Sequence, residues 1–114
     1  MVTVNIIYDG ENIVGFKAEG HAGYARAGRD IYCAGVSAIT GTALIGLQKH
    51  LTHPPIYQEK DGWLSCQLPL DIKKEDMANA QIILTTMEAG LRSLQETNPR
   101  YIKVIQGGAK YVQD

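Results

Sequence analysis

Alternating apolar and polar residues at the start of the chain predict a β-hairpin. Residues 2–8 alternate as a half-buried strand does, and the pattern resumes after the turn-forming pair Asp9-Gly10. We expect the second strand of the hairpin to end near Gly20. The positions predicted to face the core are Val2, Val4, Ile6, Val14, Phe16 and Ala18.

Helical periodicity replaces this alternation over residues 31–50. Asp30 precedes the segment and suits a helix cap, because a carboxylate accepts hydrogen bonds from the free backbone N–H groups of a first turn. Pro54-Pro55 ends the helical pattern. The apolar positions are Val36, Ile39 or Thr40, Ala43, Leu47 and Leu51. Glycines weaken the helix unless they allow close packing on a sheet, and they are Gly35, Gly41 and Gly46.

A second hairpin follows over residues 56–69. Its turn is Asp61-Gly62, and its second strand directs Leu64 and Cys66 to one apolar face. This placement predicts that Cys66 is a core residue rather than a reactive one.

A second helix and a last strand complete the pattern. The helix runs from about Lys73 to Asn98, and residues 101–106 form the strand. The apolar stripe of the helix is Ala80, Ile83, Met87, Leu91 and Leu94. The order ββαββαβ predicts an α/β (α+β) fold, a two-layer sandwich in which two helices cover one face of a five-stranded, mixed or mostly antiparallel sheet. We expect one domain over residues 1–106 and a frayed tail over 107–114.

The composition is that of an ordinary globular chain. Of its 114 residues 45% are hydrophobic and 20% charged, and the net charge of -1 gives no overall attraction to nucleic acid. The N-terminal residues lack the features of a signal peptide, and no apolar stretch is expected to reach membrane-spanning length. We therefore expect a cytoplasmic protein whose two cysteines are free thiols.

Reactive side chains flank the long loop between the first hairpin and the first helix. His21 begins the loop, Cys33 follows it, and Gly23 and Gly28 lie within it. If Asp30 caps the helix, Cys33 lies in the first turn, where the positive end of the helix dipole favours a thiolate. A histidine brought back by the loop would act as its base, and N–H groups of the first turn would stabilise an oxyanion.

Less reactive roles fit the same residues. Cys33 also suits a small core position, and His21 a strand end at the surface. A zinc site formed by His21, Cys33, His50 and His53 is excluded by the distance between two of these ligands. His50 lies near the far end of the helix that Cys33 begins, roughly 25 Å away at about 1.5 Å per residue. We therefore predict no metal site.

The segment from Gly20 to Ser37 resembles the signature of the ribosomal-processing cysteine protease family of Firmicutes and their relatives. That signature is Gly-His, a glycine-containing loop, and Gly-x-Asp-Ile-x-Cys-Ala followed shortly by Ser. The matching residues are Gly20, His21, Gly28, Asp30, Ile31, Cys33, Ala34 and Ser37. The likeness covers almost the whole chain, with Tyr32 in place of an expected valine.

This resemblance implies a cysteine endopeptidase with a Cys–His dyad and no metal or organic cofactor. Members of the family remove a short N-terminal extension from large ribosomal subunit protein twenty-seven, cleave after an aromatic pair, and form homodimers. The implied partners are therefore that extension and a second copy of the chain. Neither a membrane nor direct binding of nucleic acid is expected.

Within the implied dyad, Cys33 is the nucleophile and His21 the general base that then protonates the leaving amine. Asp30 has two interpretations, since it either caps the helix or orients His21. Ser37 follows Cys33 by one helical turn, so its hydroxyl either supports the site or bonds back to the helix backbone.

The loop itself has two interpretations. Gly23 and Gly28 would let it move as a lid that an extended peptide orders. Alternatively the loop is rigid and its glycines serve tight turns.

A non-catalytic module that binds a ribosomal protein or an assembly intermediate is the competing class. Such a binder needs no reactive thiol, so faster alkylation of Cys33 than of Cys66 would favour an enzyme. A thiol-redox sensor is disfavoured because the chain has no C-x-x-C motif.

Overall fold

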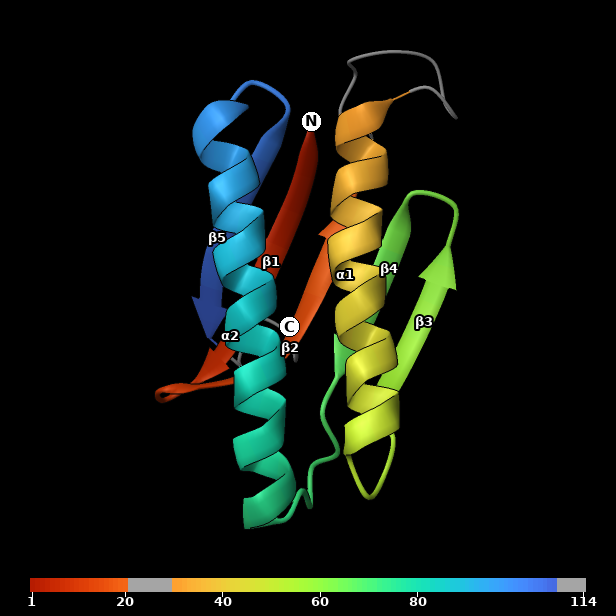
Figure 1. Cartoon of the computed structure of the whole chain (residues 1–114), viewed down its shortest axis with the longest axis vertical. Coiled ribbons are helices and arrows are strands. Elements are labelled where there is room, and N and C mark those ends of the chain that lie inside the picture. Colours follow the sequence, from red (N-terminus) through yellow and green to blue (C-terminus); the bar gives the residue numbers. More distant parts are fainter. Residues whose placement is uncertain (21–29, 109–114) are drawn as a thin grey trace.

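The computed structural model describes residues 1–20 and 30–108 and confirms the predicted order of elements (Figure 1). The strands are β1 (Val2–Asp9), β2 (Asn12–Glu19), β3 (Ile56–Lys60), β4 (Trp63–Gln67) and β5 (Ile102–Gly108). The helices are α1 (Ile31–His50) and α2 (Lys74–Thr97). Both helices cover the same face of a single sheet, as Figure 1 shows. The predicted two-layer α+β fold is therefore confirmed.

The sheet is mixed, with the strand order β3-β4-β2-β1-β5. β1 is antiparallel to β2 but parallel to β5, and both pairings of β4 are antiparallel. Two parallel strands need a long connection, and all the other elements, from β2 to α2, lie between β1 and β5 in the sequence. β5 ends at Gly108, beyond the predicted end of the last strand at Gln106.

A register shift in the first hairpin corrects one predicted core position. The shift lies between Ile7 and Tyr8, and after it Tyr8 pairs with Ile13. The extra residue reverses the alternation at this point, so Ile13 is fully buried and Val14 only half-buried. A strict alternation through Val14 was therefore wrong, because a bulge leaves no mark in the pattern of residue types.

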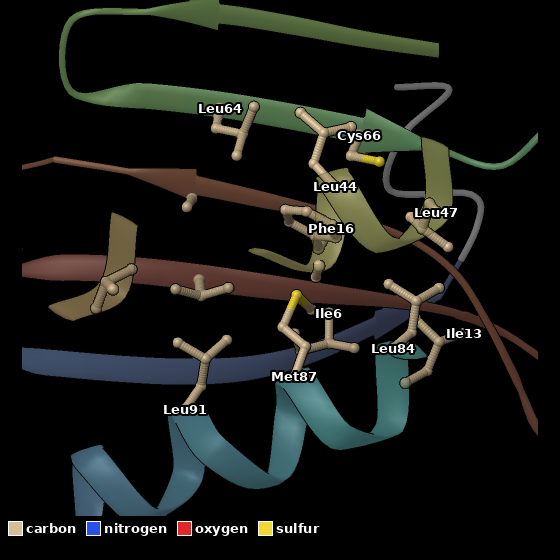
Figure 2. Close-up of a cluster of buried hydrophobic side chains, with 14 of the residues drawn as sticks. Ile6, Ile13, Phe16, Leu44, Leu47, Leu64, Cys66, Leu84, Met87 and Leu91 are labelled. Carbon is tan, nitrogen blue, oxygen red and sulfur yellow. The ribbon is translucent and has the colours of Figure 1, made fainter. Parts of the chain in front are cut away.

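The core fills the space between the sheet and both helices (Figure 2). Its largest fully buried side chains include Ile6, Ile13, Phe16, Leu47, Leu84 and Leu91. The predicted stripe of α2 is mostly confirmed, but Leu84 is fully buried while Ile83 and Leu94 are half-buried. These two side chains turn toward α1, because α2 packs against that helix as well as against the sheet.

Two glycines of α1, Gly35 and Gly46, face the other helix rather than the sheet, whereas a Cβ at Gly41 would meet no atom within 4 Å. A Cβ at Gly35 would lie 3.3 Å from a methyl group of Leu94, and a Cβ at Gly46 would lie 3.5 Å from Ile83. Their missing side chains therefore let α1 and α2 approach closely, which corrects the expectation that they pack on the sheet.

By length and composition alone, α1 could cross a membrane, and it is the one such helix in residues 1–20 and 30–108. The expectation that no stretch has this character was therefore wrong. In the fold one side of α1 packs against the sheet and α2, while Ile31 and Ile45 are exposed. The buried positions of the helix are Val36, Thr40, Ala43, Leu44 and Leu47.

Candidate active site

A cavity of about 570 Å³ opens between the N-terminal half of α1 and the adjoining ends of β2, β3 and β4. Its volume is in the range of sites that hold small ligands or short peptide segments. Three predicted site residues line it, namely Asp30, Cys33 and Ser37. The predicted site residues at the N-cap and in the first two turns of α1 therefore lie on the wall of one cavity.

The other predicted site residues, His21, Gly23 and Gly28, lie outside the described part of the chain. Gly20, which precedes His21 in the sequence, lines the cavity, and its amide donates to the carbonyl of Gly62 at 2.9 Å. The end of the strand that leads to His21 is therefore tied to the β3–β4 turn.

Gly20 also meets a steric requirement that only glycine satisfies. Its φ of 98° lies in the left-handed region, and a Cβ would approach the carbonyl oxygen of Met1 to 2.7 Å. Any side chain would displace either the strand end or the start of β1.

Asp30 is the N-cap of α1, which confirms that interpretation. Its carboxylate accepts hydrogen bonds from the amides of Tyr32 and Cys33, each at 3.1 Å, and its carbonyl accepts from Ala34 at 3.0 Å. Asp30 is only 6% exposed, so this arrangement is shielded from water. Whether Asp30 also orients His21 stays a hypothesis.

This cap changes the expected oxyanion site. The first-turn amides of Tyr32, Cys33 and Ala34 already donate to Asp30. An amide whose hydrogen bond is occupied offers little stabilisation to a developing charge. These three amides are therefore not the preformed oxyanion hole that the sequence suggested.

Cys33 is a half-buried free thiol in the first turn of α1. The residue before it, Tyr32, stacks on Tyr101, with ring centroids 4.8 Å apart and 9° between the planes. Tyr101 directly precedes β5, the edge strand opposite β3, so this stack attaches the start of α1 to the segment that enters that strand. The position of Cys33 is thus fixed by the Asp30 cap and by an aromatic contact that the sequence did not predict.

Ser37 lies one turn along α1, is exposed, and lines the same cavity as Cys33. The hydroxyls of α1 that bond back to the helix are those of Thr40, which donates to the carbonyl of Val36 at 2.8 Å, and Thr42, which donates to the carbonyl of Ala38 at 2.6 Å. Ser37 therefore lies where its hydroxyl can reach a ligand in the cavity.

Cys66 lies in the core, as predicted. It is 2% exposed, and Figure 2 shows it among the apolar side chains between β4 and α1. Burial raises the pKa of the Cys66 thiol to about 12, which keeps it protonated at neutral pH. Both cysteines are free, so the structure pairs neither with the other.

The sequence did not place the β3–β4 turn at the site. Lys60, Asp61 and Gly62 line the cavity, together with Glu59 of β3. The sequence predicts a hairpin turn at Asp61-Gly62, but the position of this turn beside Cys33 depends on β4 pairing with β2. Local sequence gives no signal for that pairing.

In the described residues no three His, Cys, Asp or Glu side chains gather as a metal site would require. His50 is exposed in the last turn of α1 and His53 in the connection that follows. Both lie at the opposite end of α1 from Cys33.

Comparison with known proteins decides the family. Residues 1–103 match the sequence profile of the family described as cysteine protease Prp. The chain belongs to this family. It is accordingly a cysteine protease of the Prp family, whose members process ribosomal proteins.

Relatives within the family agree in sequence and fold. The ribosomal processing cysteine protease Prp of Staphylococcus aureus (strain Mu50 / ATCC 700699) is 32% identical over 100 residues, covering 84% of this chain and 90% of the relative. The Prp of Bacillus subtilis (strain 168) is 26% identical over 87 residues, covering 75% and 78%. The crystal structure of S. aureus Prp with a covalently linked product peptide superposes with a TM-score of 0.81 at 26% identity, covering 93% and 99%.

Proposed function

We propose that this Prp-family chain removes a short N-terminal extension from a large-subunit ribosomal protein, using Cys33 and His21 as a catalytic dyad. The observation that carries the proposal is the position of Cys33. It lies in the first turn of a capped helix, on the wall of a cavity that also contains Gly20, the residue before His21. The covalently linked product peptide of the S. aureus relative supports a covalent mechanism.

The dyad would act in two steps. His21 takes the thiol proton as the Cys33 sulfur attacks the scissile carbonyl, and the same proton then goes to the leaving amine. Water, deprotonated by His21, hydrolyses the resulting thioester and releases the acid product. Because Asp30 occupies three first-turn amides, the oxyanion takes its hydrogen bonds from donors outside that set.

Supporting roles follow from position. Asp30 holds the first turn of α1, and the Ser37 hydroxyl binds substrate or an intermediate in the cavity. Gly23 and Gly28 allow the loop between the dyad residues to close over a bound peptide. The enzyme works as a cytoplasmic homodimer, without a membrane, a nucleic acid or a cofactor.

The test is intact-mass analysis of the extended ribosomal protein incubated with the wild-type chain. We expect loss of one defined N-terminal fragment, and no loss with Cys33→Ala or His21→Ala. Cys66→Ala is the matched control and should cleave normally, because Cys66 lies away from the cavity. Binding of the ribosomal protein without cleavage by the wild type would instead indicate a non-catalytic module.

A further inference from the structure

The two outer strands of the sheet differ in how their free edges are covered. On β5 the amide of Val104 donates to the side-chain oxygen of Gln95 at 2.5 Å, so α2 covers part of that edge. On β3 all five residues are exposed, and no side chain in residues 1–20 and 30–108 hydrogen-bonds to its backbone. An open strand edge is a template for pairing with another extended chain.

Backbone hydrogen bonds of the neighbouring strands fix which β3 groups face outward. The amide of Gly20 donates to the carbonyl of Gly62, and the amide of Leu68 donates to the carbonyl of Val14, each at 2.9 Å. Alternate residues of an antiparallel strand bond to opposite neighbours. The even-numbered residues 62–68 therefore bond toward β2, and the odd-numbered ones bond toward β3.

The register then leaves two β3 residues with outward backbone groups. The β3 partners of the odd-numbered β4 residues are Ile56, Gln58 and Lys60. The N–H and C=O groups of Tyr57 and Glu59 consequently point to the free edge. Together these two residues offer two donors and two acceptors to an added strand.

The same two residues lie on the cavity side of the sheet. Tyr57 pairs with Cys66 and Glu59 pairs with Leu64, and both of these β4 residues face the helices. Glu59 and Cys33 line the same cavity, so one end of the free edge lies at the cavity wall. An extended chain paired with Glu59 would therefore lie beside the cavity that contains the thiol.

We propose that the free edge of β3 is the docking strand for the extended peptide substrate, which adds to the sheet through the backbone of Tyr57 and Glu59. This inference rests on the proposed function, because it names how that substrate is held. The edge is short, since Pro55 lacks an N–H and directly precedes β3. Five residues span about 17 Å, enough for a peptide segment but little more.

Proline substitution tests the main-chain contact. In Glu59→Pro the outward N–H is lost while the β4 pairing, which runs through the flanking residues, is kept. Glu59→Ala removes the same side chain but keeps the N–H, so it is the matched control. For a synthetic peptide spanning the ribosomal-protein cleavage site, we expect Glu59→Pro to raise KM about tenfold, as loss of roughly 1.4 kcal/mol would.

Two further readouts separate docking from damage to the fold. The rate at which iodoacetamide alkylates Cys33 should be the same in both Glu59 variants, because both remove the same side chain from the cavity wall. N-methylation of the peptide backbone, one residue at a time, should weaken binding to Cys33→Ala protein at every second residue, because only alternate amides of an added strand face β3.

The outcomes distinguish the docking edge from the protease itself. Cleavage by the wild type with equal KM values for Glu59→Pro and Glu59→Ala would overturn the docking edge and leave the protease intact. A change from dimer to monomer in Glu59→Pro, with KM unchanged, would assign the edge to a second copy of the chain. A peptide that is neither bound nor cut by the wild type would overturn both proposals.

Discussion

Asp30 places two physical effects in opposition at the start of α1. Its hydrogen bonds to the Tyr32 and Cys33 amides stabilise the first turn. Its negative charge also offsets the positive end of the helix dipole at the same turn. In the proposed dyad, the proton of the Cys33 thiol is taken by the His21 imidazole.

The two cysteines should differ sharply in reactivity. We expect iodoacetamide at pH 8 to add once to the native protein, at Cys33, because Cys66 is buried and its pKa is raised to about 12. A second addition should appear only in denaturant. Intact mass against time measures both events, and Cys66→Ala should show the first addition alone. Two additions at similar rates to the native chain would contradict this prediction.

At the residue scale, the sequence predicted those roles that depend only on nearby residues in the chain. Asp30 was identified as a cap and Cys66 as a core residue, because each role follows from near neighbours in the chain. The burial of Ile13 was not predictable, since the bulge that causes it depends on the partner strand.

At the scale of elements, a polar network connects α2 to β1 and to the outer strand β5. Glu88 of α2 accepts hydrogen bonds from Tyr8 of β1, from Gln106 of β5 at 3.1 Å, and from Arg92 at 2.9 Å. Burial raises the pKa of Tyr8 to about 12, and its hydrogen bond to Glu88 adds to that shift. Burial alone would raise the pKa of Glu88, but the hydrogen bonds from the three donors lower it below 4.5.

This network predicts a pH-dependent contribution to stability. Because the pKa of Glu88 is lower in the folded state, its ionised form stabilises the fold above pH 4.5, and the contribution is lost as the pH falls through the folded value. We expect Glu88→Gln to lower the free energy of unfolding by about 1–2 kcal/mol at pH 7. Urea denaturation should show this gap narrowing from pH 5 to pH 3. A gap that stays constant over that range would contradict the role of the charge.

The sequence predicted which helices and strands form, but not which of them lie side by side in the fold. Periodicity gave both helices and all five strands, because each pattern reflects a face that the element itself buries. Residues Lys60–Gly62 line the cavity because β4 lies next to β2 in the sheet. This order of strands cannot be predicted from the local pattern of residues. The glycines of α1 show the same limit, since the pattern indicated close packing but not that the partner is α2.

At the scale of the whole molecule, distant parts of the chain meet at the start of α1. Tyr32 stacks on Tyr101, whose carbonyl accepts a hydrogen bond from the amide of Val2 at 2.9 Å. Val2 lines the cavity, so the cavity wall at Val2 depends on contacts among the start of α1, the start of β1 and the segment before β5.

A double-mutant cycle should measure this connection. For Tyr32→Leu, Tyr101→Leu and the double variant, we expect a coupling of about 0.5–1.5 kcal/mol in the free energy of unfolding, as stacked aromatic pairs give. Urea denaturation supplies the values. Tyr32→Phe is the control and should keep the coupling to Tyr101, because it keeps the stacked ring. Additive effects of the two leucine substitutions would show that the rings are not coupled.

The parallel pairing of β1 with β5 has a consequence for the order of synthesis. Ribosomes make β1 first among these elements and β5 last, yet the two strands are neighbours, and Val2 at the cavity is held by Tyr101. A growing chain therefore lacks its finished cavity until the segment beyond Tyr101 has emerged. Under the proposed function, a protease that acts on a ribosomal protein would become competent only once its last strand has been made and has paired with its first.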